Sequence, residues 1–142
     1  MARHKIDIEI MSIQDYGIHC FIPVKVNGIA ARLLIDTGAS KTVFDKSFIQ
    51  KHLQELYTKK SEQLTTGLGS NTIESEEAVI PLLKIGRLKI KNYHAHILDL
   101  SHVNETYKQV DLPPIDGVIG CDLLLEHQAT LNFKKKILAM SE

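Results

Sequence analysis

The amino-acid sequence predicts a single domain that is mostly β, and three observations carry this prediction. Between residues 20 and 26, apolar residues alternate with other residues, which is the period-two pattern of a strand with one buried face. Asn27-Gly28 follows directly, and this pair favours the tight turn of a β-hairpin. Only one long segment, residues 44–56, carries a clear helical stripe of apolar residues. A chain of 142 residues suits one core rather than two, so residues 1–142 are expected to form one domain.

The first half of the chain supplies four elements in order. Residues 1–15 lack the apolar run of a signal peptide, and they are expected to be an N-terminal extension or an interface strand. The strand at 20–26 returns through the hairpin as residues 31–35, which are nearly all apolar and are predicted to be covered on both faces. This strand runs straight into Asp36. The helix over 44–56 follows, with Asp45 as its predicted N-cap.

The second half returns to strands. A glycine-rich turn over 66–71 separates two strand-like arms, and a change in apolar parity between 88–90 and 93–97 predicts a bulge or bend near 91–92. Residues 101–114 are polar and are expected to form a loop or a short helix. Residues 116–120 predict a short buried strand between glycines, and Asp122 is expected to cap a helix that begins at Leu123. Two short strands complete the chain.

Composition narrows the classes of partner. Seventeen basic and seventeen acidic residues give a formal net charge of zero, so no overall field favours nucleic acid or an anionic membrane. No stretch approaches the roughly 18 apolar residues of a membrane span. The two cysteines, Cys20 and Cys121, are too few for a disulfide framework, and two free thiols suit a reducing compartment. The sequence therefore predicts a cytoplasmic protein without nucleic-acid or membrane partners.

The segment around Asp36 is the most informative for function. A carboxylate at the end of an apolar strand is costly unless it is hydrogen-bonded, paired or functional. The small residues Gly38 and Ala39 that follow would let another backbone or a ligand approach closely. Taken alone, Asp-Thr-Gly also occurs in ordinary turns, so the tripeptide by itself leaves both interpretations open.

The wider pattern resembles the active-site motif of aspartic proteases, in which a hydrophobic strand leads into Asp-Thr-Gly-Ala-Ser, here residues 36–40. A second family signature is matched at residues 118–124, Val-Ile-Gly-Cys-Asp-Leu-Leu. The glycine turn lies between them, where the family has its flap. Over about residues 20–138 the chain thus resembles the retropepsin-like single-domain aspartic proteases. The resemblance implies an all-β, single-lobed, closed barrel-like domain with a flap hairpin and one or two short helices.

The resemblance also implies roles for individual residues. Asp36 would be catalytic, and because this chemistry uses two carboxylates that share one proton, a second Asp36 would have to come from another copy of the chain. A homodimer acting on an extended peptide, without a cofactor or metal, is therefore expected. The remaining assignments fall into three groups. Active-site loop support is expected from Thr37, Gly38, Ala39 and Ser40, flap contacts with substrate from Gly67, Leu68 and Gly69, and bracing of the loop from Val118, Ile119 and Gly120.

Some features depart from the family or admit other interpretations. In retroviral members the positions of Ser40 and Cys121 often hold an acidic residue and an arginine that pair; both are absent here. Cys121 is expected to be a buried, inert thiol rather than a nucleophile. His94 and His96 share one face of a strand and are expected to be solvated rather than to bind metal. Two alternative functions stay open: a catalytically idle retropepsin-like module for dimerisation or peptide binding, and a small β-rich binding protein unrelated to proteases.

Overall fold

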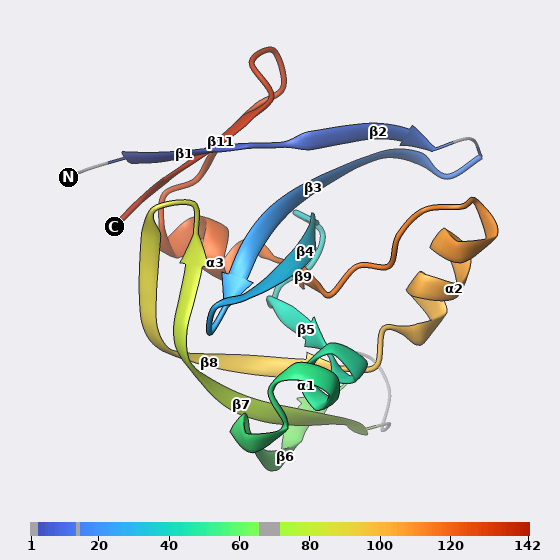
Figure 1. Cartoon of the computed structure of the whole chain (residues 1–142), viewed down its shortest axis with the longest axis vertical. Coiled ribbons are helices and arrows are strands. Elements are labelled where there is room, and N and C mark those ends of the chain that lie inside the picture. Colours follow the sequence, from blue (N-terminus) through green and yellow to red (C-terminus); the bar gives the residue numbers. More distant parts are fainter. Residues whose placement is uncertain (1–2, 14, 66–71) are drawn as a thin grey trace.

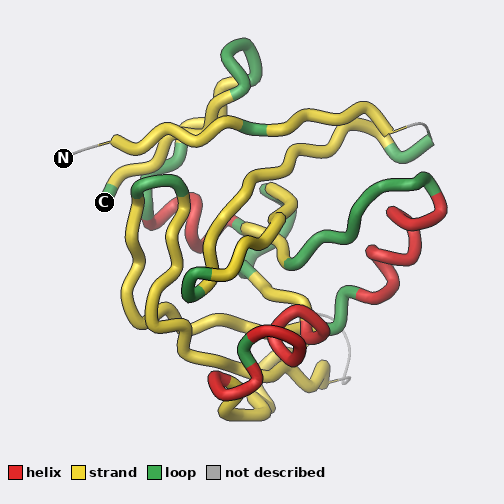
Figure 2. Tube along the Cα trace, viewed as in Figure 1, coloured by secondary structure: helices red, strands yellow, loops and turns green. Residues whose placement is uncertain are grey.

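The computed structural model describes residues 3–13, 15–65 and 72–142, and these fold into two sheets with a few short helices (Figures 1 and 2). The smaller sheet has the strand order β1-β11-β10. Its strands are β1 (Arg3–Asp7), β10 (Thr130–Asn132) and β11 (Ile137–Ser141). β1 pairs antiparallel with β11 of its own chain, which brings the two ends of the described chain together.

The larger sheet has the order β2-β3-β4-β9-β5-β8-β7-β6. Its strands are β2 (Glu9–Ile13), β3 (Gly17–Val26), β4 (Ile29–Ile35), β5 (Val43–Asp45), β6 (Tyr57–Thr65), β7 (Thr72–Ile85), β8 (Leu88–Leu98) and β9 (Gly117–Ile119). β3 also pairs with β7, and this pairing closes the six strands β3-β4-β9-β5-β8-β7 into a barrel. The predicted all-β, closed barrel-like domain is confirmed.

Local backbone preferences explain the hairpin between β3 and β4. Asn27 has φ 48° and Gly28 has φ 85°, and two consecutive positive φ values are what a two-residue hairpin turn of matching twist requires. The predicted hairpin is confirmed. On β4, Ala31 and Leu33 are buried, whereas Leu34 and Ile35 are half-buried, so the strand is covered on its second face only in part.

The predicted irregularity near 91–92 is a bend and not a bulge. Asn92 has φ 52°, yet β7 and β8 keep one register from Glu76↔Ile97 to Ile85↔Leu88. The partner strand changes its buried parity as well, from Ile80 to Leu83, on either side of Pro81. Because β7 and β8 change the parity of their buried residues at paired positions, the two strands stay in register without an extra residue.

The barrel interior holds the main core. Its largest fully buried side chains are Ile22, Leu33, Phe44, Ile49, Leu53, Ile80, Leu83, Ile85, Leu88, Ile97 and Ile119. Each such side chain contributes about 1.5–3 kcal/mol when it leaves water. This core fixes β4 and β9, the strands that lead into the site described below.

The predicted helix over 44–56 is wrong at its beginning. Phe44 lies in β5, where it pairs with Ile97 and Gly117, and helix α1 spans Lys46–His52, followed by the 3-10 turn η1 at Gln54–Leu56. Asp45 is the N-cap residue, but its carboxylate accepts a hydrogen bond from the Leu100 backbone N–H (2.9 Å) instead of from α1. Pairing between distant strands therefore overrides the local helical pattern.

Helix α2 (Ser101–Gln109) lies outside the barrel, beside the end of the β2–β3 hairpin (Figure 1). Tyr107 is its buried residue, and its ring packs edge-on against Phe21 with 5.9 Å between centroids. The guanidinium of Arg32 lies 3.9 Å from the centre of the same Phe21 ring. Phe21 is thus only 2% exposed, so the prediction that β3 has one buried face is wrong at this point.

α2 contributes to a second hydrophobic cluster, which we call the α2 cluster. Its buried members are Ile13, Phe21, Val43, Leu100, Tyr107, Ile115 and Val118. Helix α3 (Cys121–Glu126) begins before Asp122, with Gly120 as its N-cap residue, so the predicted capping by Asp122 is wrong. Within the described ranges, no helix is long and apolar enough to cross a membrane.

Candidate active site

Asp36 is placed by the pairing of two parallel strands. β4 runs beside β9 with Ile35 opposite Ile119, and the Asp36 N–H donates to the Ile119 carbonyl at 3.0 Å. The strand ends there, and the Asp36 side chain is exposed at the rim of the barrel. The backbone ladder therefore fixes where this carboxylate emerges.

The residues after Asp36 form a tight turn that the carboxylate itself helps to hold. The Ala39 N–H donates to the Asp36 carbonyl at 3.1 Å, and the Gly38 N–H donates to Asp36 Oδ1 at 2.9 Å. A Cβ atom on Gly38 would lie 3.1 Å from that same Oδ1. Glycine at this position thus lets the backbone N–H approach the carboxylate without crowding it.

The turn is braced from behind by the start of α3. The Cys121 N–H donates to the Ala39 carbonyl at 2.8 Å, and Cys121 Sγ donates to the Thr37 carbonyl at 3.0 Å. A Cβ atom on Gly120 would lie 2.7 Å from the Lys41 carbonyl oxygen and 2.8 Å from that of Ala39. No side chain fits there, so the sequence needs glycine for the two backbone segments to touch.

Thr42 and Asp122 complete this brace, and the sequence did not single them out for it. Thr42 is fully buried, and its hydroxyl accepts from the Gly120 N–H (2.9 Å) and donates to Asp122 Oδ1 (2.7 Å). The same Oδ1 accepts from the backbone N–H groups of Thr42 (2.9 Å) and Leu123 (2.8 Å). Burial raises the pKa of the neighbouring Tyr93 hydroxyl well above its ordinary value, and the charge of Asp122 raises it further.

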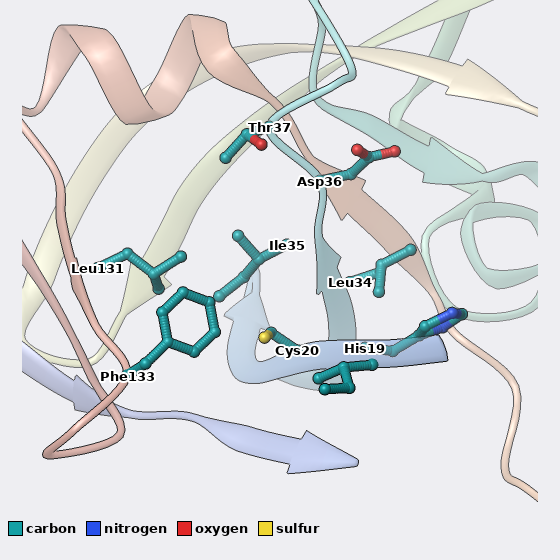
Figure 3. Close-up of a pocket in the computed structure, with 9 residues that line it drawn as sticks. His19, Cys20, Leu34, Ile35, Asp36, Thr37, Leu131 and Phe133 are labelled. Atoms are coloured by element: carbon teal, nitrogen blue, oxygen red, sulfur yellow. The ribbon is translucent and has the colours of Figure 1, made fainter. Parts of the chain in front are cut away.

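A cavity of about 410 Å³ opens in front of Asp36 (Figure 3). Its lining consists of Ile18, His19, Cys20, Leu34, Ile35, Asp36, Thr37, Leu131 and Phe133. We call it the Asp36 cavity. In Figure 3 the Asp36 carboxylate lies above Leu34 and His19, with Leu131 and Phe133 across the opening. Of these lining residues, Asp36 is the one that carries a carboxylate.

A second cavity of about 440 Å³ adjoins the first and shares Ile35, Thr37 and Leu131 with it. Cys121, Leu124, Leu125 and Leu138 are among its other lining residues. Three large apolar side chains of the two cavities are exposed: Ile18 at 68%, Leu125 at 81% and Phe133 at 56%. Large apolar side chains are thus exposed to water around both cavities.

The structure brings together most of the residues that the sequence pointed to. Asp36 and Thr37 line the cavity, residues 38–40 form the turn, and residues 118–120 lie directly behind it. Gly67, Leu68 and Gly69, predicted as the flap, lie outside the described residues. Cys20 and Cys121 are both free thiols, as expected, but Cys121 is exposed, so its predicted burial is wrong. His94 is exposed and His96 half-buried on the face opposite Ala95 and Ile97.

Comparison with known proteins agrees with this geometry. A family model described as "Aspartyl protease" matches residues 22–123. Among curated relatives, Protein DNA-DAMAGE INDUCIBLE 1 from Arabidopsis thaliana is 24% identical over 124 residues, which cover 87% of this chain and 27% of that protein. DNA damage-inducible protein 1 from Kluyveromyces lactis is 22% identical over 148 aligned residues, covering 99% and 32%. The chain thus spans about a quarter to a third of these relatives.

Two solved structures share the fold. A retropepsin-like aspartic protease from Rickettsia conorii superposes with a TM-score of 0.57 at 23% identity, covering 98% of this chain and 92% of that one. The retroviral protease-like domain of Ddi1 from Leishmania major gives a TM-score of 0.57 at 18% identity, covering 84% and 86%. With the fold, the Asp36 turn and the family match in agreement, this chain belongs to the aspartyl protease family and has its retropepsin-like fold.

Proposed function

We propose that this protein is an aspartic endopeptidase that works as a homodimer and hydrolyses peptide bonds with a water activated by two Asp36 carboxylates, one from each subunit. The observation that carries the proposal is the setting of Asp36. Its carboxylate is exposed in a cavity, is held by the Gly38 N–H, and is the one carboxylate of the residues that line that cavity.

Peptide hydrolysis by this mechanism needs two carboxylates, so a chain that supplies one must act together with a second copy. Two carboxylates that lie close together cannot both ionise, so they share one proton. The ionised carboxylate takes a proton from the attacking water, and the protonated one donates a hydrogen bond to the scissile carbonyl oxygen. A twofold axis brings a residue to its own mate, so two Asp36 side chains can meet on the axis of a symmetric dimer.

The exposed apolar side chains near Asp36 support the proposal that two copies of the chain associate. Ile18, Leu125 and Phe133 are more than half exposed and line the two cavities that share Thr37 of the Asp36 turn. We call this surface the dimer face. An exposed apolar patch of this kind marks an interaction surface, and a partner subunit that places its own Asp36 beside the first would cover it.

The remaining features of the proposal come from the sequence. Thr37, exposed beside Asp36, would form a hydrogen bond across the dimer axis, and residues 67–69 would close over an extended peptide. The free thiols of Cys20 and Cys121 fit a reducing compartment, which supports a location in the cytoplasm.

The test compares wild type with Asp36→Asn on a diverse peptide library, from mildly acidic to neutral pH, with sequencing of the products. Asparagine keeps an oxygen that can accept from the Gly38 N–H, so the variant should keep the turn and the dimer while losing cleavage. Cleavage by both proteins at the same rate would overturn the mechanism. Activity per molecule should also fall on dilution through the dimer dissociation constant.

The same measurements separate the alternative function. If wild type forms a dimer and binds peptides but cleaves none of the library at any pH tested, the domain is a catalytically idle module for dimerisation or peptide binding. A protein that stays monomeric at high concentration would contradict the homodimeric protease and the dimerisation module together.

A further inference from the structure

The chain has no net charge, but its acidic residues avoid one side of the barrel. Residues 16–35 and 78–98, which hold β3, β4, β8 and the end of β7, contain no Asp or Glu. The same two segments carry a group of permanently charged basic residues: Lys25, Arg32, Lys84, Arg87, Lys89 and Lys91. This side of the barrel is therefore basic although the whole chain is neutral.

Three of these lysines lie next to one another on adjacent strands. Lys25 on β3 pairs with Lys84 on β7, and Lys84 pairs in turn with Lys89 on β8. Directly paired residues lie on the same face of a sheet. Their neighbours along the strands are buried in the barrel core: Val24, Val26, Leu83, Ile85 and Leu88. The three lysines thus form a row on the outer surface, which we call the lysine row.

The charges of the lysine row are not neutralised within the described residues. None of the three side chains takes part in an ion pair or a hydrogen bond there. Lys25 and Lys89 are exposed, and Lys84 is half-buried between them. Like charges directly opposite each other destabilise a sheet, and Lys84 has such a neighbour on both sides. A bound anion would remove this repulsion.

The lysine row lies far from the candidate active site, near the turn between β3 and β4 (Figure 1). Lys25 pairs with Ala30 at the beginning of β4, and Asp36 follows the end of the same strand. At about 3.3 Å per residue, the six residues from Ala30 to Asp36 span about 20 Å. A partner bound at the lysine row would leave the Asp36 cavity open.

We propose that the lysine row binds an acidic, extended segment of a protein partner. Since neighbouring strands are about 4.8 Å apart, the three charges lie within about 10 Å, a length that a few residues of an extended peptide cover. Lysine has a flexible stem and binds as a point charge, so it suits single carboxylates. Lys91 is exposed two residues after Lys89 and lengthens the basic surface along β8. The inference does not depend on the proposed protease activity.

The surroundings of the lysine row favour a peptide over other anionic partners. Residues 22–26 and 82–91 contain no aromatic side chain on which the bases of a single-stranded nucleic acid could stack. A protein that binds at a membrane surface adds large exposed apolar side chains to its lysines. The structure places none of the exposed large apolar side chains that it describes within these two segments. Charge alone is offered here, and a carboxylate-rich peptide needs no more.

The first experiment measures fluorescence anisotropy of a labelled twelve-residue peptide of alternating Glu and Ala at low salt. All proteins carry Asp36→Asn, so that the probe is not cleaved. Lys25→Gln, Lys84→Gln and Lys89→Gln are combined in one variant. Losing three exposed ion pairs should weaken binding at least about fivefold.

The matched control removes the same charge elsewhere. Lys134→Gln, Lys135→Gln and Lys136→Gln are combined in the exposed turn between β10 and β11, and this variant should bind the peptide within about twofold of the protein with all lysines. Equal losses in both variants would show a response to net charge only and would overturn the inference. Absence of peptide binding to the protein with all lysines would overturn it as well.

Two further measurements complete the test. An oligothymidylate of the same charge and vesicles that contain phosphatidylserine should bind more weakly than the peptide. Tighter binding of either, lost in the lysine-row variant, would assign the surface to nucleic acid or membrane and overturn the inference. Lys84→Gln should also raise the denaturant midpoint at low salt, because it relieves the repulsion, whereas Lys135→Gln should not. If Lys84→Gln does not raise the midpoint, the charges are not in conflict and the inference loses its basis.

Discussion

Replacing Gly120 by alanine should displace the backbone that holds Asp36. The added methyl group would lie 2.7 Å from the Lys41 carbonyl oxygen and 2.8 Å from that of Ala39, and both are main-chain atoms that cannot rotate away. Inserting a methyl group into a tightly packed site costs about 1–3 kcal/mol. Since Ala39 and Lys41 belong to the turn after Asp36, the displacement should also reduce catalysis, by about 100-fold if the carboxylate moves by roughly 1 Å.

Gly38→Ala is the informative comparison. Its added methyl group would meet only the Asp36 carboxylate oxygen, at 3.1 Å, and a side chain can move. The variant should therefore lose activity with a smaller loss of stability than Gly120→Ala. The assay pairs denaturant unfolding with peptide cleavage for both variants. If Gly120→Ala unfolds at the wild-type midpoint and cleaves at the wild-type rate, the argument from close backbone contact is refuted.

Three other predictions address the brace, the dimer face and the half-buried carboxyl group of Asp116. Thr42→Val should cost about 1–3 kcal/mol in unfolding free energy, because the Gly120 N–H loses its acceptor, and Thr42→Ser should recover most of it. Leu125→Asp and Phe133→Asp should each raise the dimer dissociation constant, measured by sedimentation equilibrium, at least about tenfold. The monomer should stay folded, since both side chains are mostly exposed. If the dissociation constant does not change, the dimer face is not the dimer interface. Burial raises the pKa of Asp116 above 3.8, so the folded state binds more protons than the unfolded state just above pH 3.8, and stability falls as pH rises through that window. Asp116→Asn has no carboxyl group to ionise there, so its free energy of unfolding relative to that of wild type should increase from acidic to neutral pH. If the difference between the two free energies of unfolding is the same at every pH, the burial argument is contradicted.

The parts of the fold that local residues decide could be predicted from the sequence. Asn27-Gly28 determines a hairpin because both residues tolerate positive φ, whatever packs around them. The Asp36 turn follows from small residues placed after an apolar strand. The buried strand at 117–119 follows from its apolar residues and flanking glycines. In each case the information lies within a few consecutive residues.

The parts that the sequence did not reveal depend on partners far along the chain. The sequence around Phe44 has a helical pattern, but Phe44 lies in β5 because it pairs with residues of β8 and β9. Phe21 alternates as an outward residue but is covered by Tyr107, which lies 86 positions later. Thr42 was missed for the same reason, since its role depends on hydrogen bonds with Gly120 and Asp122, which lie far from it in the sequence.

The α2 cluster connects helix α2 physically to the candidate active site. Buried Val118 belongs to this cluster, and Leu34 and Ala39 pack against it, so the α2 cluster underlies both the strand before Asp36 and the turn after it. Tyr107 of α2 belongs to the same cluster. Because packed interiors transmit displacement, a change in the packing of α2 should shift the surface that supports Asp36.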